Sequence, residues 1–158
     1  MTPVPGPYVH VYDSVPALWP PEADFLLAYD DGARTSHNFA EARSKRPYAR
    51  IIQCTTTGRP GVRVIDVESG DSSVPHAALL VRSELAAKRR PWLYCSDDTR
   101  GTLETALHHL AIAPTDLDWW EANPDGAAVV NPGWQAHQYA WSAAYDTSVA
   151  LLSAACLT

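Results

Sequence analysis

Basic residues are scarce in this sequence. Its 158 residues include 12 lysines and arginines against 18 aspartates and glutamates, which gives a net charge of −6. The one basic cluster, Lys88-Arg89-Arg90, stands at the predicted end of a helix, where cations favour the helix dipole. Nucleic-acid binding normally needs a clear basic surface, so we expect no nucleic-acid partner.

Long apolar runs are missing as well. None approaches the roughly 18 residues that a membrane-spanning helix needs, so we expect no membrane partner. The N-terminal stretch MTPVPGPYVHVYD has neither the basic start nor the apolar core of a signal peptide. We therefore expect a protein that is cytoplasmic when it is synthesised.

Cysteine and histidine patterns typical of disulfide frameworks or metal sites are absent. The three cysteines are odd in number and form no Cys-x-x-Cys pair, which favours a reducing compartment. Cys54 and Cys95 close apolar stretches and are interpreted as small buried residues, with a catalytic cysteine as the minority alternative. His108-His109 lies in a helical pattern without zinc-ligand spacing. We expect no metal and no cofactor.

What is present is the composition of one globular domain, residues 1–158, with 46% apolar and 19% charged residues. Short β-rich runs alternate with helical patterns, which is typical of parallel βαβ units. Strands are predicted at Tyr8–Asp13, Asp24–Tyr29, Ala49–Cys54, Val62–Val67, Trp92–Cys95, Asp118–Glu121, Ala127–Val130 and Ala136–Ala140. Helices are predicted at Ser36–Lys45, Pro75–Arg89 and Thr99–Ala111, with a short closing helix at Ser148–Cys156.

Eight strand-like runs indicate a closed barrel. A typical (β/α)8 barrel has about 250 residues, and this chain is much shorter. The segment Thr55–Gly61 is too short for a helix. The sequence therefore predicts an α/β fold, a compact TIM-like (β/α) barrel with several helices shortened or missing.

Acidic residues recur at the ends of the predicted strands, where parallel barrels place their chemistry. The best of these is Asp66-Val67-Glu68, because side chains two apart on a strand point the same way. Crowded carboxylates raise each other's pKa, so one can stay protonated and act as a general acid on a glycosidic oxygen. Asp13 ends the first run, and Asp146 follows the last.

Each of these features also has a plain structural interpretation. An Asp-x-Glu pattern after a strand arises often by chance, and acids at strand ends commonly cap a helix or a turn. Asp30-Asp31-Gly32 is typical of a simple turn, and Trp119-Trp120 is equally compatible with the core. A different small α/β hydrolase or transferase is the weakest hypothesis, because there is no Gly-x-Ser-x-Gly and no phosphate-binding glycine loop.

Six segments, in order, resemble the family-25 glycoside hydrolases, the lysozyme-like muramidases of bacteria and phages. The similarity is closest to a short variant from actinobacteria and their phages. The best segment is Val64–Asp71, which holds the Asp-Val-Glu tripeptide. The others are Tyr12–Ser14, Ala28–Gly32, Arg90–Ser96, Asp118–Ala122, and His137–Tyr139 followed by Tyr145-Asp146.

The resemblance implies hydrolysis of the β-1,4 bond between N-acetylmuramic acid and N-acetylglucosamine in peptidoglycan. Glu68 matches the general acid, and Asp66, Asp13 and Asp146 match its acidic partners. Groove positions that would bind the substrate correspond to Tyr29, Asp31, Trp120, Gln138 and Tyr139. The protein would act at the cell wall after release, as an endolysin does, or within a phage particle.

The chain is shorter than typical members of that family and shows no separate cell-wall-binding domain. A second hypothesis is therefore a non-catalytic binding or structural protein derived from a lysozyme, for example a component of a bacteriophage virion. Its partners would be other virion or cell-wall proteins. Fold alone does not distinguish these two functions.

Overall fold

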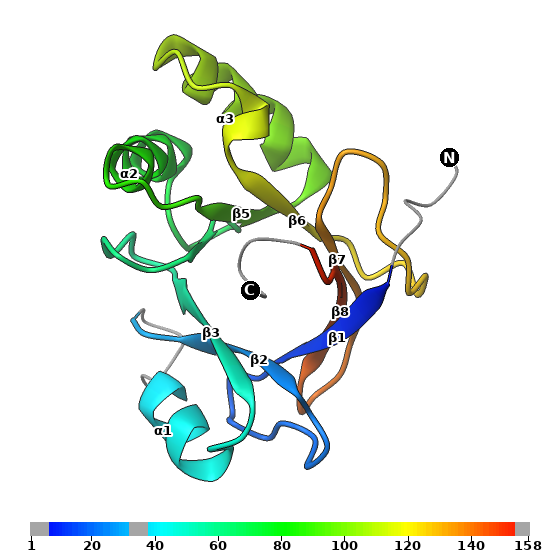
Figure 1. Cartoon of the computed structure of the whole chain (residues 1–158). Helices are drawn as coiled ribbons and strands as arrows, with labels where there is room; N and C mark the ends of the chain where they lie inside the picture. Colours follow the sequence, from blue (N-terminus) through cyan, green and yellow to red (C-terminus); the bar gives the residue numbers. More distant parts are fainter. Residues whose placement is uncertain (1–6, 32–37, 154–158) are drawn as a thin grey trace.

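The computed structural model describes residues 7–31 and 38–153 and shows an α/β fold built on a closed barrel of eight strands (Figure 1). The strands follow one another around the barrel in sequence order, and β8 closes it onto β1. They are β1 (Tyr8–Asp13), β2 (Phe25–Tyr29), β3 (Arg50–Thr55), β4 (Val64–Asp66), β5 (Trp92–Cys95), β6 (Asp118–Ala122), β7 (Ala136–Trp141) and β8 (Asp146–Leu151).

The barrel is mixed rather than wholly parallel. Strands β1 to β7 pair in parallel, whereas β8 is antiparallel to both β7 and β1. The reason is the connection between β7 and β8, residues 142–145, which is a hairpin turn. A parallel crossover needs a dozen or more residues, so a turn of this length forces the last strand to run back.

Two predictions near the C-terminus are wrong. Ala127–Val130 is irregular and not a strand, because its backbone is bound elsewhere: the carbonyl of Val129 accepts from the ring of His137 at 2.7 Å. The first part of the helix predicted at Ser148–Cys156 is instead in strand β8, whose backbone pairs on both sides. Residues 154–156 of that prediction lie outside the described part. The barrel is therefore closed by the strand at residues 146–151, and residues 127–130 belong to a loop.

Within residues 7–31 and 38–153, three α-helices lie outside the barrel, with a short 3-10 helix at Pro114–Asp116. Helix α1 (Asn38–Lys45) follows β2, and the proposed cap Ser36 lies outside the described residues. Helix α2 (Val74–Ala86) stops before the predicted end at Arg89, since Lys88 takes the left-handed φ of 59°. Helix α3 (Asp97–His109) begins two residues before the predicted start at Thr99, and its N-cap is Ser96, whose side chain accepts from the backbone of Thr99.

Helices cover only part of the barrel. Figure 1 shows α2 and α3 outside β5 and β6 and α1 outside β2 and β3, while β7, β8 and β1 carry no helix. In the described residues, no helix separates β3 from β4 or β6 from β7, in line with the prediction of missing helices. The helices that the structure describes are also too short or too polar to reach across a bilayer.

Apolar side chains form two main layers, as alternation along the strands requires. One layer fills the barrel and includes Trp92, Trp120 and Cys54. The other lies between the sheet and helices α2 and α3 and includes Cys95 and Leu103. Both cysteines are fully buried and free, which confirms their interpretation as small core residues.

Candidate functional site

Acidic side chains gather at one mouth of the barrel. Parallel strands bring their C-terminal ends together, which places Asp13 and Asp66 at that mouth. Asp146 begins the antiparallel β8 and pairs directly with Asp13, so it reaches the same mouth. A cavity of about 140 Å³ opens there, and its walls are Asp13, Val15, Tyr29, Thr56, Asp66, Glu68, Asp71, Tyr94 and Asp146.

The Asp66-Val67-Glu68 tripeptide has the geometry that its spacing predicts. Asp66 and Glu68 both face the cavity, while Val67 is buried on the other side with the residues of α2. Asp66 is only 3% exposed, whereas Glu68 is exposed. The backbone N–H of Glu68 donates to Oδ1 of Asp66 at 3.0 Å, and carboxylate oxygens of Asp66, Glu68 and Asp71 lie within 4.8 Å of one another.

Burial and like charge raise the pKa of two carboxyls in this cavity. Burial raises the pKa of Asp66 well above its ordinary value; the charges of Glu68 and Asp71 add to this, and the N–H of Glu68 opposes it. Burial raises the pKa of Asp13 to about 7, against the hydrogen bond from Tyr29 and with the help of Asp146 and Glu68. The cavity is therefore able to hold protons near neutral pH.

Asp13 is held in place by a chain of hydrogen bonds that begins in α1. The hydroxyl of Tyr29 donates to Oδ2 of Asp13 at 2.5 Å. The side chain of the buried Asn38 accepts from the backbone of Tyr29 at 2.7 Å and donates to the carbonyl of Ser14 at 2.6 Å. The first residue of α1 thus fixes the ends of β1 and β2 relative to each other.

Gln138 holds two residues of the cavity wall from behind. Its side-chain oxygen accepts a short hydrogen bond from the hydroxyl of Tyr94, and its amide donates to Asp146. Burial raises the pKa of Asp146, and the hydrogen bonds from Ser142 and Gln138 oppose that shift. Gln138 was predicted as a substrate-binding residue, and the structure places it as a residue that positions Tyr94 and Asp146.

Trp120 lies inside the barrel, away from solvent. It is 1% exposed, its indole N–H donates to the hydroxyl of Ser148 at 3.0 Å, and its ring packs edge-on against Trp92 and Tyr94. A sugar stacks only on a ring with an accessible face. The structure therefore corrects the prediction of Trp120 as a groove residue: the strand register turns this ring into the core.

Asp31 and Tyr139 also lie away from the walls of the acidic cavity. The carboxylate of Asp31 accepts from the hydroxyls of Thr55 and Thr57 at 2.6 and 2.7 Å and from the backbone of Thr56 at 2.9 Å. Burial would raise the pKa of Asp31, but these hydrogen bonds lower it. Asp31 thus braces the loop after β3. Tyr139 lies beside His10 instead, with 3.4 Å between its hydroxyl and Nδ1 of His10.

Several residues of the cavity wall were not predicted as site residues. Tyr94 lies one residue before the end of β5, and its signal was the alternation that turns it inward with Trp92. Asp71 lies in the Val64–Asp71 segment, but no local pattern shows that the chain turns back there. Val15 and Thr56 come from loops and carry no sequence signal.

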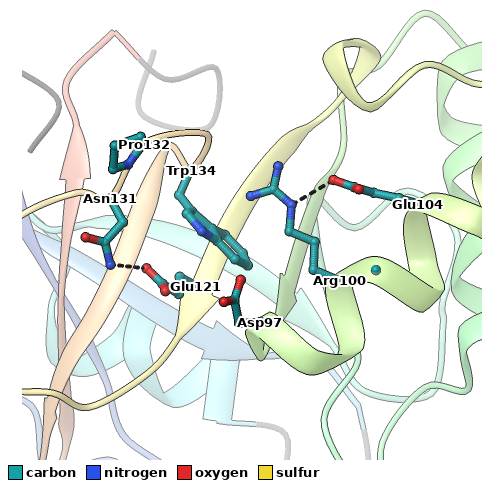
Figure 2. Close-up of a pocket in the computed structure, with 8 residues that line it drawn as sticks. Asp97, Arg100, Glu104, Glu121, Asn131, Pro132 and Trp134 are labelled. Atoms are coloured by element: carbon teal, nitrogen blue, oxygen red, sulfur yellow. Dashed lines mark hydrogen bonds and ion pairs between the residues drawn. The ribbon is translucent and has the colours of Figure 1, made fainter. Parts of the chain in front are cut away.

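A larger cavity of about 610 Å³ lies between α3 and the loop before β7, and Figure 2 shows the side chains that line it. The guanidinium of Arg100 lies over the rings of both Trp119 and Trp134, 4.8 and 4.4 Å from their centres. Asn131 donates to the buried Glu121 at 2.7 Å. The contacts of Arg100 join α3 to the loop, and the bond from Asn131 joins the loop to β6. None of the predicted site residues lines this cavity.

Three carboxylates of the smaller cavity could hold a divalent cation. Asp66, Glu68 and Asp71 offer oxygens close to one another, and hard cations prefer oxygen ligands. No protein-family model, curated protein or solved structure matches the chain. The resemblance to the family-25 glycoside hydrolases therefore stays a prediction.

Proposed function

We propose that the protein is a peptidoglycan-cleaving glycoside hydrolase of the lysozyme type. The observation that supports this most is the meeting of Asp13, Asp66, Glu68 and Asp146 in one cavity at the barrel mouth. Glycoside hydrolysis uses one carboxyl that keeps its proton and a second carboxylate nearby. The raised pKa values of Asp13 and Asp66 meet the first requirement near neutral pH.

In this proposal Glu68 donates the proton to the glycosidic oxygen. It is the exposed member of the Asp66–Glu68 pair, so it is the one that a polymeric substrate reaches first. Asp66 lies behind it with a raised pKa, so it favours the protonated form and can pass its proton to Glu68, whose carboxylate oxygen lies within 4.8 Å. Asp13 or Asp146, across the mouth, stabilises the positive charge that develops on the sugar or orients the attacking water.

We further propose that the barrel is a shortened TIM-like barrel of the family-25 kind. Strands β1 to β7 run in parallel in sequence order, and helices follow β2, β4 and β5. Asp13 and Asp66 lie at the C-terminal ends of β1 and β4, where TIM barrels carry their sites, and Asp146 reaches the same mouth because β8 runs back. The antiparallel β8 is the main departure from that pattern.

A second candidate is a non-catalytic protein derived from a lysozyme, binding cell-wall polysaccharide or taking part in a phage particle. The size of the cavity favours it. At about 140 Å³ the acidic cavity is smaller than the roughly 300–1,000 Å³ of typical small-molecule sites. The acids would then remain as part of a binding surface.

A cell-wall assay separates the two candidates. Purified protein is incubated with actinobacterial peptidoglycan, and clearing of turbidity and release of new reducing ends are measured. We expect Glu68→Gln to lose activity by about 10²–10⁴-fold, the usual contribution of a positioned general acid. Glu41→Gln, an exposed glutamate on α1, is the matched control and should keep full activity.

Equal clearing by the wild type and Glu68→Gln would rule out the assignment of Glu68. Binding of the polysaccharide by the wild type without any new reducing ends would favour the second candidate.

A further inference from the structure

The cavity between α3 and the loop before β7, which we call the α3 cavity, takes no part in the proposed function. Its volume of about 610 Å³ lies within the roughly 300–1,000 Å³ of typical small-molecule sites. The acidic cavity at the barrel mouth is far smaller, at about 140 Å³. What the α3 cavity can hold follows from the side chains of its wall (Figure 2).

Arg100 presents a fixed guanidinium to the α3 cavity. Its Nε donates to Glu104 at 2.9 Å, and the group lies over the rings of Trp119 and Trp134. Its side chain is only 18% exposed, and its two Nη groups make no hydrogen bond within residues 7–31 and 38–153. A guanidinium that is held in place with its outer N–H groups unused is pre-organised to bind a carboxylate through two parallel hydrogen bonds.

A tight turn at residues 131–134 forms the wall beside Arg100. The backbone N–H of Trp134 donates to the carbonyl of Asn131 at 3.1 Å, with Pro132 and Gly133 between them. A type II turn favours proline at its second position and needs a positive φ at its third, and Gly133 has a φ of 87°. A Cβ at Gly133 would lie only 3.5 Å from Nη2 of Arg100, so this glycine also leaves the guanidinium uncovered.

Glu121 brings the opposite charge to the same cavity. Its side chain is 5% exposed, and Oε2 accepts from Asn131 at 2.7 Å. Oε1 of Glu121 and the side-chain oxygen of Asn131 accept no hydrogen bond from the described part of the chain. Asp97, the first residue of α3, lines the cavity as well and has no hydrogen bond or ion pair there. These unused oxygens match the several N–H donors of an ammonium or a guanidinium group.

The carboxylates of the α3 cavity suit an organic cation rather than a metal ion. Among the described residues, only Asp66, Glu68 and Asp71 at the barrel mouth bring three such groups close enough together to share an ion. The carboxylates of the α3 cavity do not, although its volume is more than four times that of the acidic cavity. The cation that they meet is therefore part of a larger molecule.

The distribution of charge in the wall narrows the ligand further. One guanidinium, that of Arg100, stands against the three carboxylates of Asp97, Glu104 and Glu121, which leaves a net charge of −2. Figure 2 shows the ring of Trp134 between Arg100 and Glu121, so the anionic and cationic groups of the ligand must lie well apart. A basic amino acid has this arrangement, since it carries a carboxylate at one end and a cation at the end of a long side chain.

We propose that the α3 cavity binds a basic amino acid, either free or as the C-terminal residue of a peptide. Arg100 holds the carboxylate, and Glu121 with Asn131 holds the side-chain ammonium or guanidinium. Asp97, which is exposed, adds long-range attraction for the cation. None of these residues lines the acidic cavity, so this binding is independent of the proposed glycoside hydrolysis.

Calorimetry with a series of ligands tests both ends of the site. L-Lysine is compared with norleucine, which lacks the side-chain ammonium, and with lysinamide, which lacks the carboxylate. Each missing charge should weaken binding roughly tenfold or more, because it removes hydrogen bonds between charged groups. Gly-Gly-Lys separates the two sources of the ligand: tighter binding of the peptide than of lysine indicates a peptide terminus, and the reverse indicates a free amino acid.

Variants of the wall assign each loss to a residue. We expect Glu121→Gln to weaken the binding of lysine roughly tenfold and to leave that of norleucine unchanged. Arg100→Lys keeps the charge but loses the paired N–H groups, so it should weaken the binding of lysine and leave that of lysinamide unchanged. Asp97→Asn should weaken lysine binding less, and Asp98→Asn is its matched control, since both residues begin α3 but Asp98 does not line the cavity.

Equal affinity of the wild type for lysine, norleucine and lysinamide would overturn the proposal, as would no binding of either lysine or Gly-Gly-Lys at millimolar concentration. Unchanged lysine binding in folded Glu121→Gln would overturn it too. Because Arg100 also joins α3 to the loop, the ligand series on the wild type decides the matter even if Arg100→Lys does not fold. Glu68→Gln should bind lysine as the wild type does, which keeps this test separate from the cell-wall assay.

Discussion

The hydroxyl of Tyr29 donates a 2.5 Å hydrogen bond to Oδ2 of Asp13, while Oδ1 of the same carboxyl is buried without a hydrogen-bond partner among the described residues. A buried oxygen without a partner destabilises the ionised form of the carboxyl. The two oxygens thus have opposite effects on the pKa of Asp13. The hydrogen bond to Oδ2 lowers the pKa, whereas the unpaired Oδ1 raises it and is the oxygen that takes up the proton. This asymmetry leads to two predictions.

Removing the tyrosine hydroxyl should raise the pKa of Asp13 further. The hydrogen bond from Tyr29 favours the ionised carboxylate and so lowers a pKa that burial has raised to about 7. In Tyr29→Phe we expect the pKa of Asp13 to lie above 7, measured by the carboxyl carbon shift in an NMR titration. Tyr48→Phe serves as the control, and an unchanged or lowered pKa in Tyr29→Phe would contradict the assignment.

We expect the free energy of unfolding to fall as the pH rises, because Asp13 loses its proton while it is buried. Its folded pKa of about 7 lies above the ordinary pKa of 3.8 for an aspartate, so the folded state binds more protons than the unfolded state in that range. The free energy of unfolding therefore falls as the pH rises from about 4 to 7, by roughly 1.4 kcal/mol for each unit of pKa difference. Asp66 and Asp146, whose pKa values are also raised, contribute in the same direction.

Asp13→Asn removes this titrating group while keeping its shape. We expect urea unfolding at several pH values to show a smaller loss of stability between pH 4 and 7 in Asp13→Asn than in the wild type. Asp24→Asn is the control, because that residue precedes β2 at the other end of the barrel. Parallel curves for the wild type and Asp13→Asn would show that Asp13 does not carry the effect.

His137 should be essential for the loop between β6 and β7. Its ring is fully buried, and its two nitrogens lie 2.7 and 2.8 Å from the carbonyl oxygens of Val129 and Asn123. Carbonyl oxygens only accept, so both contacts are hydrogen bonds only if both nitrogens carry a proton. Carboxylate oxygens of Asp125 and Glu121 lie 3.5 and 4.0 Å from Nε2 of the same ring.

We expect His137→Gln to lower the free energy of unfolding by about 1–3 kcal/mol, since a glutamine side chain cannot bridge the carbonyl oxygens of Val129 and Asn123 as the ring does. Chemical denaturation measures the loss. His108→Gln, on the exposed face of α3, is the control and should change stability by less than about 0.5 kcal/mol. Equal stability of both variants would argue against this role of His137.

Local sequence patterns predicted much of the barrel because strands β1 to β6 carry their own signals. Each has β-branched or aromatic residues bounded by acids, glycines or prolines. The last part of the barrel was less predictable: Ala127–Val130 is as apolar as a strand, yet its backbone is bound by His137. Whether a segment joins a sheet depends on which backbone partners remain, and that is not a local property.

The sequence by itself determined that Asp66 and Glu68 share one face, because the two-residue repeat of an extended chain is local geometry. It also determined that acids end the first and fourth strands. Only the tertiary structure decided that Asp146 joins them, since this follows from the reversal of β8 at the hairpin. Closure of the barrel likewise buried Trp120 and left Trp141 at the mouth, because it decides which face of each strand meets solvent.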